Sequence, residues 1–156
     1  MEEVKTRIEE EVQLVVFSVG EEEYALEIEQ VQEINRLLPI TRVPRAPSFI
    51  EGVINLRGNV IPVVNLHYRL GVGTRVNTND TRIIIALVYD NPVGLVVDRV
   101  SEVLYLPKNR IESPDSVGGI ARVEYLRGIG KVDGRLILLL NLDALLEVDR
   151  LLKQVS

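Results

Sequence analysis

Short apolar runs separated by polar turns recur along this chain, and they predict strands more often than helices. Residues 14–19 and 24–28 flank a polar turn, which indicates a hairpin. Residues 82–89 and 93–97 repeat this arrangement around a second turn that contains Pro92. Val, Ile and Leu supply most of the apolar residues in these runs, as expected for a pleated and largely buried surface. The pattern therefore predicts a mainly β protein.

The longest regular pattern is a stretch from Gly52 to Leu70, which reads as strand, tight turn, strand and short helix. Its turn is predicted at Arg57-Gly58-Asn59, because glycine adopts positive φ without steric cost. The same pattern returns without a gap from Gly128 to Leu146. Positions that match include Gly52 with Gly128, Gly58 with Gly134, and Asn65 with Asn141. A repeat of this length predicts two similar subdomains.

Three further segments are less strand-like. Val31 and Ile34 have helical spacing and predict a short helix over residues 29–35. Prolines mark residues 39–47 as an edge or connector, and residues 107–122 have the composition of a loop. An apolar stripe predicts a C-terminal helix over residues 142–154.

Together these patterns predict two small five-stranded barrels packed side by side along a shared apolar seam, because closing a small sheet hides its edges. The expected ranges are 12–80 for the first barrel and 81–141 for the second. We expect residues 142–156 to form a helix that packs on the barrels, and residues 1–11 to be a flexible tail.

Composition excludes several functions for this sequence. The 156 residues contain no cysteine and carry a net charge of −5. Disulfides and cysteine-based zinc sites are therefore absent, and general nucleic-acid binding is disfavoured. Arg36, Arg42 and Arg45 lie close together, but we expect them to face water or protein rather than DNA. No apolar run is long enough for a membrane-spanning helix and no signal region is evident, which predicts a cytoplasmic protein.

The polar residues give little support to catalysis. His67 is the single histidine, and we expect it to be a surface or capping residue rather than a metal ligand. The acidic residues 21–23 are expected at a solvated hairpin tip. Asp98 and its repeat counterpart Glu29 are interpreted as helix N-caps. These assignments favour a binding module over an enzyme, with no metal and no cofactor.

Two features call for a partner. Arg57 stands at a predicted rigid turn, where it either faces water or offers a forked donor to a carboxylate or main-chain carbonyls. A set of apolar residues on short elements either fills the seam or leaves an apolar groove for a partner helix, and spacing favours the seam. This set comprises Val31, Ile34, Val100 and Val103.

Several of these motifs resemble CheW-type chemotaxis coupling proteins, in the same order and over residues 12–150. The Gly-Val-Ile-Asn-Leu-Arg-Gly block that begins at Gly52 is the most specific of them. The segments that carry the resemblance are Val31-Gln32-Glu33-Ile34, residues 49–58, residues 61–66, residues 94–100 and Gly134-Arg135-Leu136-Ile137.

The resemblance implies two five-stranded SH3-like barrels and no catalytic activity. Members of that family are scaffolds that bridge the cytoplasmic tips of methyl-accepting chemoreceptors to the regulatory domain of the histidine kinase CheA, in membrane-associated arrays. It also implies a protein that is a monomer when free and is not inserted in the membrane. A detached regulatory domain of a CheA-like kinase, or of a CheV-like protein, is the alternative, although the chain has no room for a kinase or receiver domain.

The resemblance further implies two sets of site residues. The receptor groove maps to Ile28, Val31, Glu33, Ile34, Gly52, Arg57 and Val100. The kinase contact maps to Glu112, Ser113, Pro114, Asp115, Ser116 and Val117, although the charges of this loop differ from the pattern expected for the family.

Overall fold

The computed structural model describes residues 10–116 and 123–146. Its strands are β1 (Glu11–Val19), β2 (Glu22–Glu27), β3 (Val31–Arg36), β4 (Ile50–Leu56), β5 (Asn59–Val64), β6 (Arg82–Val88), β7 (Asn91–Val97), β8 (Arg99–Pro107), β9 (Ile111–Glu112), β10 (Leu126–Val132) and β11 (Arg135–Leu140). The short helices are η1 (Ile28–Gln30), α2 (Leu66–Leu70), η2 (Lys108–Arg110), η3 (Pro114–Ser116), η4 (Val123–Tyr125) and α3 (Leu142–Leu146).

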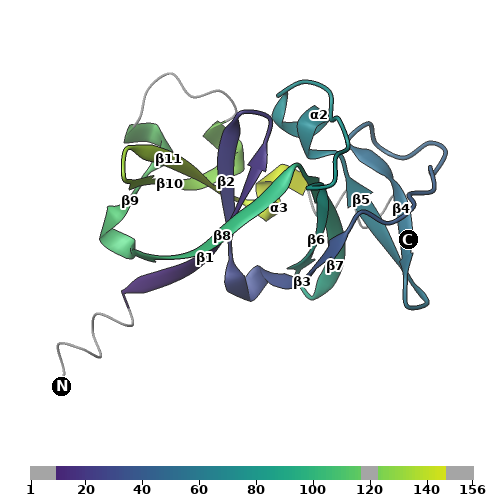
Figure 1. Ribbon diagram of the computed structural model, residues 1–156, viewed down its shortest axis with the longest axis horizontal. Helices are drawn as coiled ribbons and strands as arrows, with labels where there is room; N and C mark the ends of the chain where they lie inside the picture. The colour runs from purple at the N-terminus through teal and green to yellow at the C-terminus, as the bar shows by residue number, and fades with distance from the viewer. Residues whose placement is uncertain (1–9, 117–122, 147–156) are drawn as a thin grey trace.

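The strands form two sheets that lie side by side as two lobes (Figure 1). One sheet has the order β8-β1-β2-β11-β10-β9 and the other has the order β3-β6-β7-β5-β4. The predicted class, all-β with short helices, is confirmed. The first sheet has six strands rather than five, because the two-residue strand β9 pairs with β10.

The two halves of the sequence exchange their first hairpins. The β1–β2 hairpin pairs with β8 and, in parallel, with β11, whereas the β6–β7 hairpin pairs with β3 and, in parallel, with β5. Each sheet therefore draws strands from both sides of the predicted boundary at residues 80 and 81. The ranges 12–80 and 81–141 do not correspond to the sheets, because strand periodicity does not specify a pairing partner.

In each sheet, the connecting chain brings the first and last strands close together. In the first sheet, β8 continues through η2 into β9, which pairs with β10. In the second sheet, the chain after β3 reaches Thr41, whose amide and carbonyl each hydrogen-bond Val53 of β4 at 2.8 Å. Each lobe therefore curls around its own interior without a continuous hydrogen-bonded ladder between its first and last strands.

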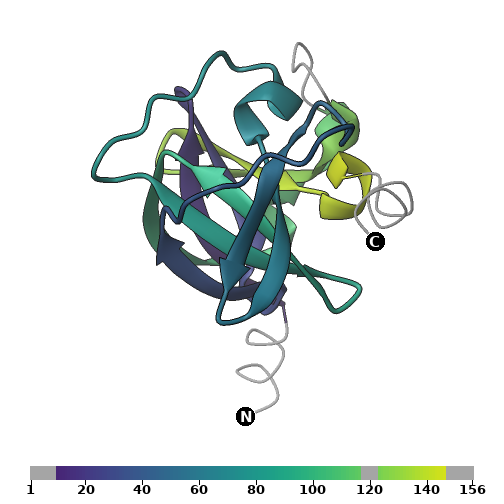
Figure 2. The same cartoon turned by 90° about the vertical axis from the view of Figure 1, so that its right-hand side faces the viewer.

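The core has three parts that follow this arrangement. Ile54, Ile61 and Ile83 belong to a cluster within the β3–β7 sheet, and Leu14, Ala25 and Leu139 belong to a cluster within the other sheet. The largest cluster combines side chains of both sheets, including Phe17 and Leu95. This third cluster is the predicted apolar seam. Figure 2 shows the two lobes turned by 90°, one behind the other.

The helix predicted over residues 29–35 is wrong. The chain makes only the 3-10 turn η1 and then continues as β3, which pairs with β6 from Val31 to Arg36. Side chains along β3 alternate between half-buried and exposed, and two of the half-buried ones are Glu33 and Asn35. Polar residues on the inner face hid the period of two, so that only the spacing of Val31 and Ile34 remained visible.

Other segment boundaries also differ from expectation. Residues 107–122 were expected to be loop, but they include the end of β8 together with η2, β9 and η3, and residues 117–122 lie outside the described residues. The predicted C-terminal helix is described as α3, with Leu142, Leu145 and Leu146 buried, and residues 147–156 lie outside. The expected tail lies outside except for Glu10 and Glu11, and Glu11 begins β1.

The repeated asparagines have the same local role in both halves. Asn65 Oδ1 accepts a hydrogen bond from the backbone N–H of Tyr68 at 3.2 Å, and Asn141 Oδ1 accepts one from Ala144 at 3.3 Å. Both contacts satisfy an N–H at a helix start that would otherwise lack a partner. The match between these positions in the sequence therefore reflects equivalent helix caps on α2 and α3.

Candidate functional site

The first candidate site is an ion pair between Arg57, at the β4–β5 turn, and Glu33 on β3. Arg57 Nη2 lies 3.0 Å from Glu33 Oε1 and 2.7 Å from Oε2. Asn35 Nδ2 donates to the same carboxylate at 2.8 Å. Because β3 and β4 are the first and last strands in the order of their sheet, this pair links the two ends of the sheet.

Local backbone geometry places Arg57 at the tip of the hairpin. Arg57 has φ of 50° and Gly58 has φ of 87°, as a two-residue turn of type I′ requires. Asn55 Oδ1 accepts a hydrogen bond from the Gly58 N–H at 2.9 Å. The turn is therefore the one predicted from the sequence, and it leaves the Arg57 side chain 66% exposed.

The electrostatics of this pair favour an ionised carboxylate. Hydrogen bonds from Arg57 first, and from Asn35 second, lower the pKa of Glu33 below its usual value of 4.5. The equivalent turn in the second half has the same backbone shape, with φ of 48° at Asp133 and 79° at Gly134. It carries an acid in place of the arginine, so the two turn tips have opposite charge.

The apolar residues of the predicted receptor groove divide between the seam and the surface. Val31 and Val100 are half-buried and pack against the core cluster shared by the two sheets. Ile34 is 40% exposed and Val103 is 48% exposed, one on β3 and the other on β8. Ile28 is half-buried in η1. Val31 and Val100 therefore adjoin the seam, whereas Ile34 and Val103 face solvent.

Gly52 occupies a position with no room for a side chain. A Cβ added there would lie 2.2 Å from the Thr41 carbonyl oxygen, so the absence of a side chain permits the Thr41–Val53 bridge. Gly52 lies in β4 (Ile50–Leu56) and thereby supports the hairpin whose tip carries Arg57.

The residues predicted to contact the kinase lie on the lobe of the β8–β11 strands. Glu112 pairs with Ile129 in β9, and its carboxylate lies 3.4 Å from Lys131 Nζ. Ser113 precedes η3, which contains Pro114, Asp115 and Ser116. Val117 lies outside the described residues.

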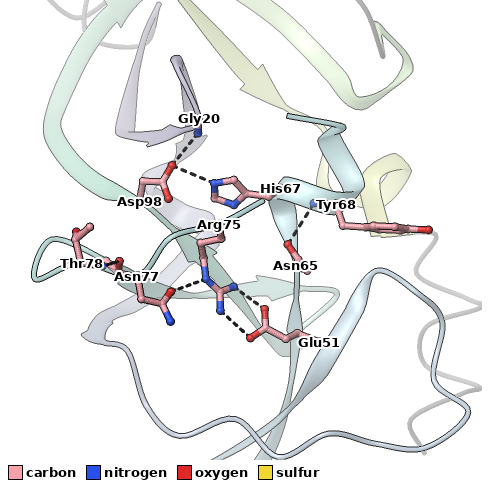
Figure 3. A network of polar contacts seen from close by, with 10 residues as sticks. Gly20, Glu51, Asn65, His67, Tyr68, Arg75, Asn77, Thr78 and Asp98 are labelled. Atoms are coloured by element: carbon pink, nitrogen blue, oxygen red, sulfur yellow. Dashed lines mark hydrogen bonds and ion pairs between the residues drawn. The ribbon is translucent and has the colours of Figure 1, made fainter. Parts of the chain in front are cut away.

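The expectations for His67 and Asp98 are wrong. His67 is 3% exposed, and its Nε2 lies 3.1 Å from Asp98 Oδ2, which also accepts a hydrogen bond from the Gly20 N–H at 2.8 Å (Figure 3). Asp98 thus joins α2 of one lobe to the β1–β2 turn of the other instead of capping a helix. The single histidine looked like a surface residue because its repeat counterpart is Asp143, and no local pattern in the sequence indicated Asp98 as its partner.

A second arginine clamp lies nearby and was not foreseen. Arg75, in the segment between α2 and β6, donates through Nη1 and Nη2 to the two carboxylate oxygens of Glu51 at 2.5 and 2.8 Å (Figure 3). Its Nε donates to Asn77 Oδ1 at 2.7 Å. The clamp ties this connecting segment to β4.

Within residues 10–116 and 123–146, no three His, Cys, Asp or Glu side chains converge in a way that could hold a metal ion. The helices in the same residues are all too short or too polar to cross a membrane. Fold and site together define a two-lobed all-β domain whose notable polar groups are surface ion pairs and interlobe contacts.

Comparison with known proteins identifies the family. The model of the CheW-like domain matches residues 13–150, so the chain belongs to the CheW family. It is 37% identical to the chemotaxis protein CheW of Rhizobium meliloti, covering 85% of each chain, and 38% identical to that of Bacillus subtilis, covering 86% of each. The scaffolding protein TtCheW from Thermoanaerobacter tengcongensis has a similar structure, with a TM-score of 0.81 and 42% identity over 89% of this chain and 90% of the other.

Proposed function

We propose that this protein is a non-enzymatic adaptor that couples methyl-accepting chemoreceptors to the histidine kinase CheA. Family membership over residues 13–150 and the structural similarity to a scaffolding protein support this proposal. In this role the protein needs no cofactor and joins membrane-associated receptor arrays through its partners. The single observation that carries the proposal is the ion pair between Arg57, at the β4–β5 turn, and Glu33 of β3, the strand that also exposes Ile34.

The proposed receptor site is the outer surface of β3 and the adjoining seam edge. Ile34 supplies exposed apolar area on that strand, and Val31 and Val100 are half-buried against the core cluster at the seam. A helical hairpin of the receptor would lay its apolar face on this strip, as in other helix-in-groove complexes.

Arg57 would set the register of that helix. Both contacts to Glu33 use one nitrogen, Nη2, so Nη1 and Nε have no hydrogen-bond partner in the described part of the chain. A guanidinium has five N–H donors in a fixed fork, and those left over suit a carboxylate or main-chain carbonyls. Because Glu33 already holds the side chain in place, little conformational entropy is lost when a partner binds.

The proposed kinase contact is separate from the receptor site. Glu112 and the η3 residues belong to the other lobe, so one adaptor could bind both partners at once. Val117 is included in this proposal on the family resemblance alone.

The first prediction concerns Arg57→Ala. We expect this change to weaken binding of a receptor cytoplasmic tip by about 1–3 kcal/mol, the amount expected for a lost charged hydrogen bond. Isothermal titration calorimetry with a purified receptor tip measures it. Binding to the regulatory domain of CheA should remain as in the wild type.

Arg110→Ala is the matched control, because Arg110 is exposed in η2 of the other lobe. It should leave receptor affinity unchanged. If folded Arg57→Ala protein binds the receptor as tightly as the wild type, the receptor site is misplaced. If the wild type binds neither partner, the adaptor function itself is wrong.

A further inference from the structure

The segment between β3 and β4 forms a cavity that the proposed receptor and kinase contacts do not use. The cavity has a volume of about 750 Å³ and is lined by residues 40, 42–48, 50 and 51. It lies at the start of β4, whereas Arg57 follows the end of that strand. At about 3.3 Å per residue, the cavity and the Arg57 turn are about 20 Å apart. The segment borders the outermost strand of its lobe (Figure 1).

The cavity is positively charged in a protein whose net charge is negative. Arg42 and Arg45 line it, and both are exposed without an ion-pair or hydrogen-bond partner in the described residues. Glu51 is the only acid in the lining, and Arg75 neutralises it through two hydrogen bonds. Two arginine charges therefore remain uncompensated, although the whole chain carries a net charge of −5.

The backbone holds Arg45 in an unusual conformation at this place. The Ala46 N–H approaches the Val43 carbonyl at 3.5 Å, which closes a turn with Pro44 at its second position and Arg45 at its third. Arg45 has φ of 66°, and glycine or asparagine is usual at such a position. Strained non-glycine residues of this kind concentrate at binding sites, where the surrounding structure maintains them.

The walls of the cavity are apolar as well as basic. Pro44, Pro47 and Ile50 contribute to them, together with Val43 and Ala46. Prolines restrict the loop before a ligand arrives, which reduces the entropy lost on binding. A small inorganic anion would use the arginines but not the apolar walls. A peptide with alternating acidic and apolar side chains would use both.

We propose that the cavity of residues 40–51 is a docking site for an acidic, partly apolar peptide segment of a partner protein. Arg42 and Arg45 bind carboxylates of that segment, and the proline-rich walls take its apolar side chains. The site is independent of the receptor groove at Arg57 and of the kinase contact at residues 112–117.

The test uses the full chain and a short synthetic peptide that alternates glutamate with leucine. Fluorescence polarisation measures affinity, and amide shifts in ¹⁵N-labelled protein locate the site. We expect shifts at residues 40–51, and about tenfold or greater loss of affinity in R42E/R45E. Arg45→Gly should also weaken binding, and it cannot fail by misfolding of the turn because glycine tolerates the φ of 66°.

Three controls make the outcome decisive. K108E/R110E makes the same charge change on exposed residues of η2, and it should bind the peptide as the wild type does. Arg57→Ala should also bind normally, so failure of the receptor proposal is distinguishable from failure of this one. A peptide that alternates lysine with leucine should not bind.

Four results would overturn the proposal. They are no binding of the glutamate peptide, shifts outside residues 40–51, equal loss in K108E/R110E, or displacement of the peptide by inorganic phosphate at equal concentration. The last result would assign the arginines to a small-anion site.

Discussion

At the scale of single residues, arginines join segments that are distant in the sequence. Arg57 holds Glu33, Arg75 holds Glu51, and Arg135 Nε and Nη2 donate to Glu23 at 3.1 and 2.5 Å. Arg75 and Arg135 each donate from two nitrogens to the two oxygens of a carboxylate, whereas Arg57 donates to both oxygens from one nitrogen. These contacts are partly exposed, so they specify which segments meet more than they stabilise the fold.

The Glu23–Arg135 pair predicts a pH dependence. The hydrogen bond from Arg135 lowers the pKa of Glu23 below 4.5 in the folded protein. The pair therefore stabilises the fold above pH 4.5, and its contribution is lost as the pH falls through the folded-state pKa. We expect Glu23→Gln to lower the free energy of unfolding by about 0.5–1 kcal/mol near neutral pH, allowing for solvent screening. Urea unfolding of both proteins over a pH series measures this difference.

The difference between wild type and Glu23→Gln should shrink as the solution becomes more acidic than pH 4.5. Glu21→Gln is the control, because Glu21 is exposed at the same hairpin. A difference that stays constant across the series would contradict the assigned role of Arg135.

At the scale of elements, the two repeated hairpins have the same register shift beside a glycine, but different atoms surround the two glycines. The strand register shifts next to Gly52 in the β4–β5 hairpin and next to Gly128 in the β10–β11 hairpin. An added Cβ at Gly52 would meet backbone, the Thr41 carbonyl oxygen, at 2.2 Å. At Gly128 it would meet the branch methyl of a side chain, Ile111 Cγ2, at 2.4 Å, and the Glu112 carbonyl oxygen only at 3.3 Å. The same glycine thus accommodates a fixed obstacle in one half and a movable one in the other.

This contrast predicts unequal costs for the same substitution. Gly52→Ala should lower the free energy of unfolding by about 1–3 kcal/mol, because the Thr41–Val53 bridge must separate. Gly128→Ala should cost less than Gly52→Ala, because its main obstacle is the half-buried Ile111 side chain, which can shift more readily than backbone. Thermal unfolding of the two variants compares them directly. Equal losses of stability would mean that the Thr41 backbone yields as easily as the Ile111 side chain.

At the scale of the whole molecule, the hairpin exchange makes the two lobes depend on both halves of the chain. Within its sheet, the β1–β2 hairpin pairs with β8 and β11, which come from the second half of the chain. Asp98 strengthens this dependence, because it contacts Gly20 of one lobe and His67 of the other. We therefore expect the fold to unfold as a single cooperative unit rather than as two independent domains.

A split of the chain tests this conclusion. Residues 10–80 and 81–146, produced separately, should each lack a stable fold, because each contains strands whose partners are on the other piece. Produced together, the two pieces should restore the β spectrum in circular dichroism and a single melting transition. A cooperative transition in either piece alone would contradict the interleaved pairing.

The sequence revealed the parts of this fold that depend on local geometry. The turn at Arg57-Gly58 and the caps at Asn65 and Asn141 follow from the preferences of single residues, and each matches the structure. The repeat also predicted two similar units and a shared seam. Pairing between distant strands has no local signature, so the exchange of hairpins could not be inferred.

The candidate site was also only partly predictable, because contacts between distant residues have no local signature in the sequence. Arg57 was identified from its turn, but its partner Glu33 was expected on a helix, because the inward polar residues of β3 hid the strand period. His67 was expected at the surface, because only the folded chain brings Asp98 within 3.1 Å of its ring. The Arg42–Arg45 cluster was visible in the sequence, whereas the cavity it lines arises from the path of the loop.

The exchange of hairpins also has a consequence during synthesis. The β1–β2 hairpin leaves the ribosome first, but its partner strands are made later. Phe17 pairs with Val100 of β8, and Tyr24 pairs with Leu138 of β11. At a translation rate of about 5–20 residues per second, that wait is on the order of ten seconds. Throughout it, the apolar run from Leu14 to Phe17 has no partner strand beyond β2. The acidic residues 21–23 at its tip then act as a gatekeeper, because like charges oppose pairing between nascent chains.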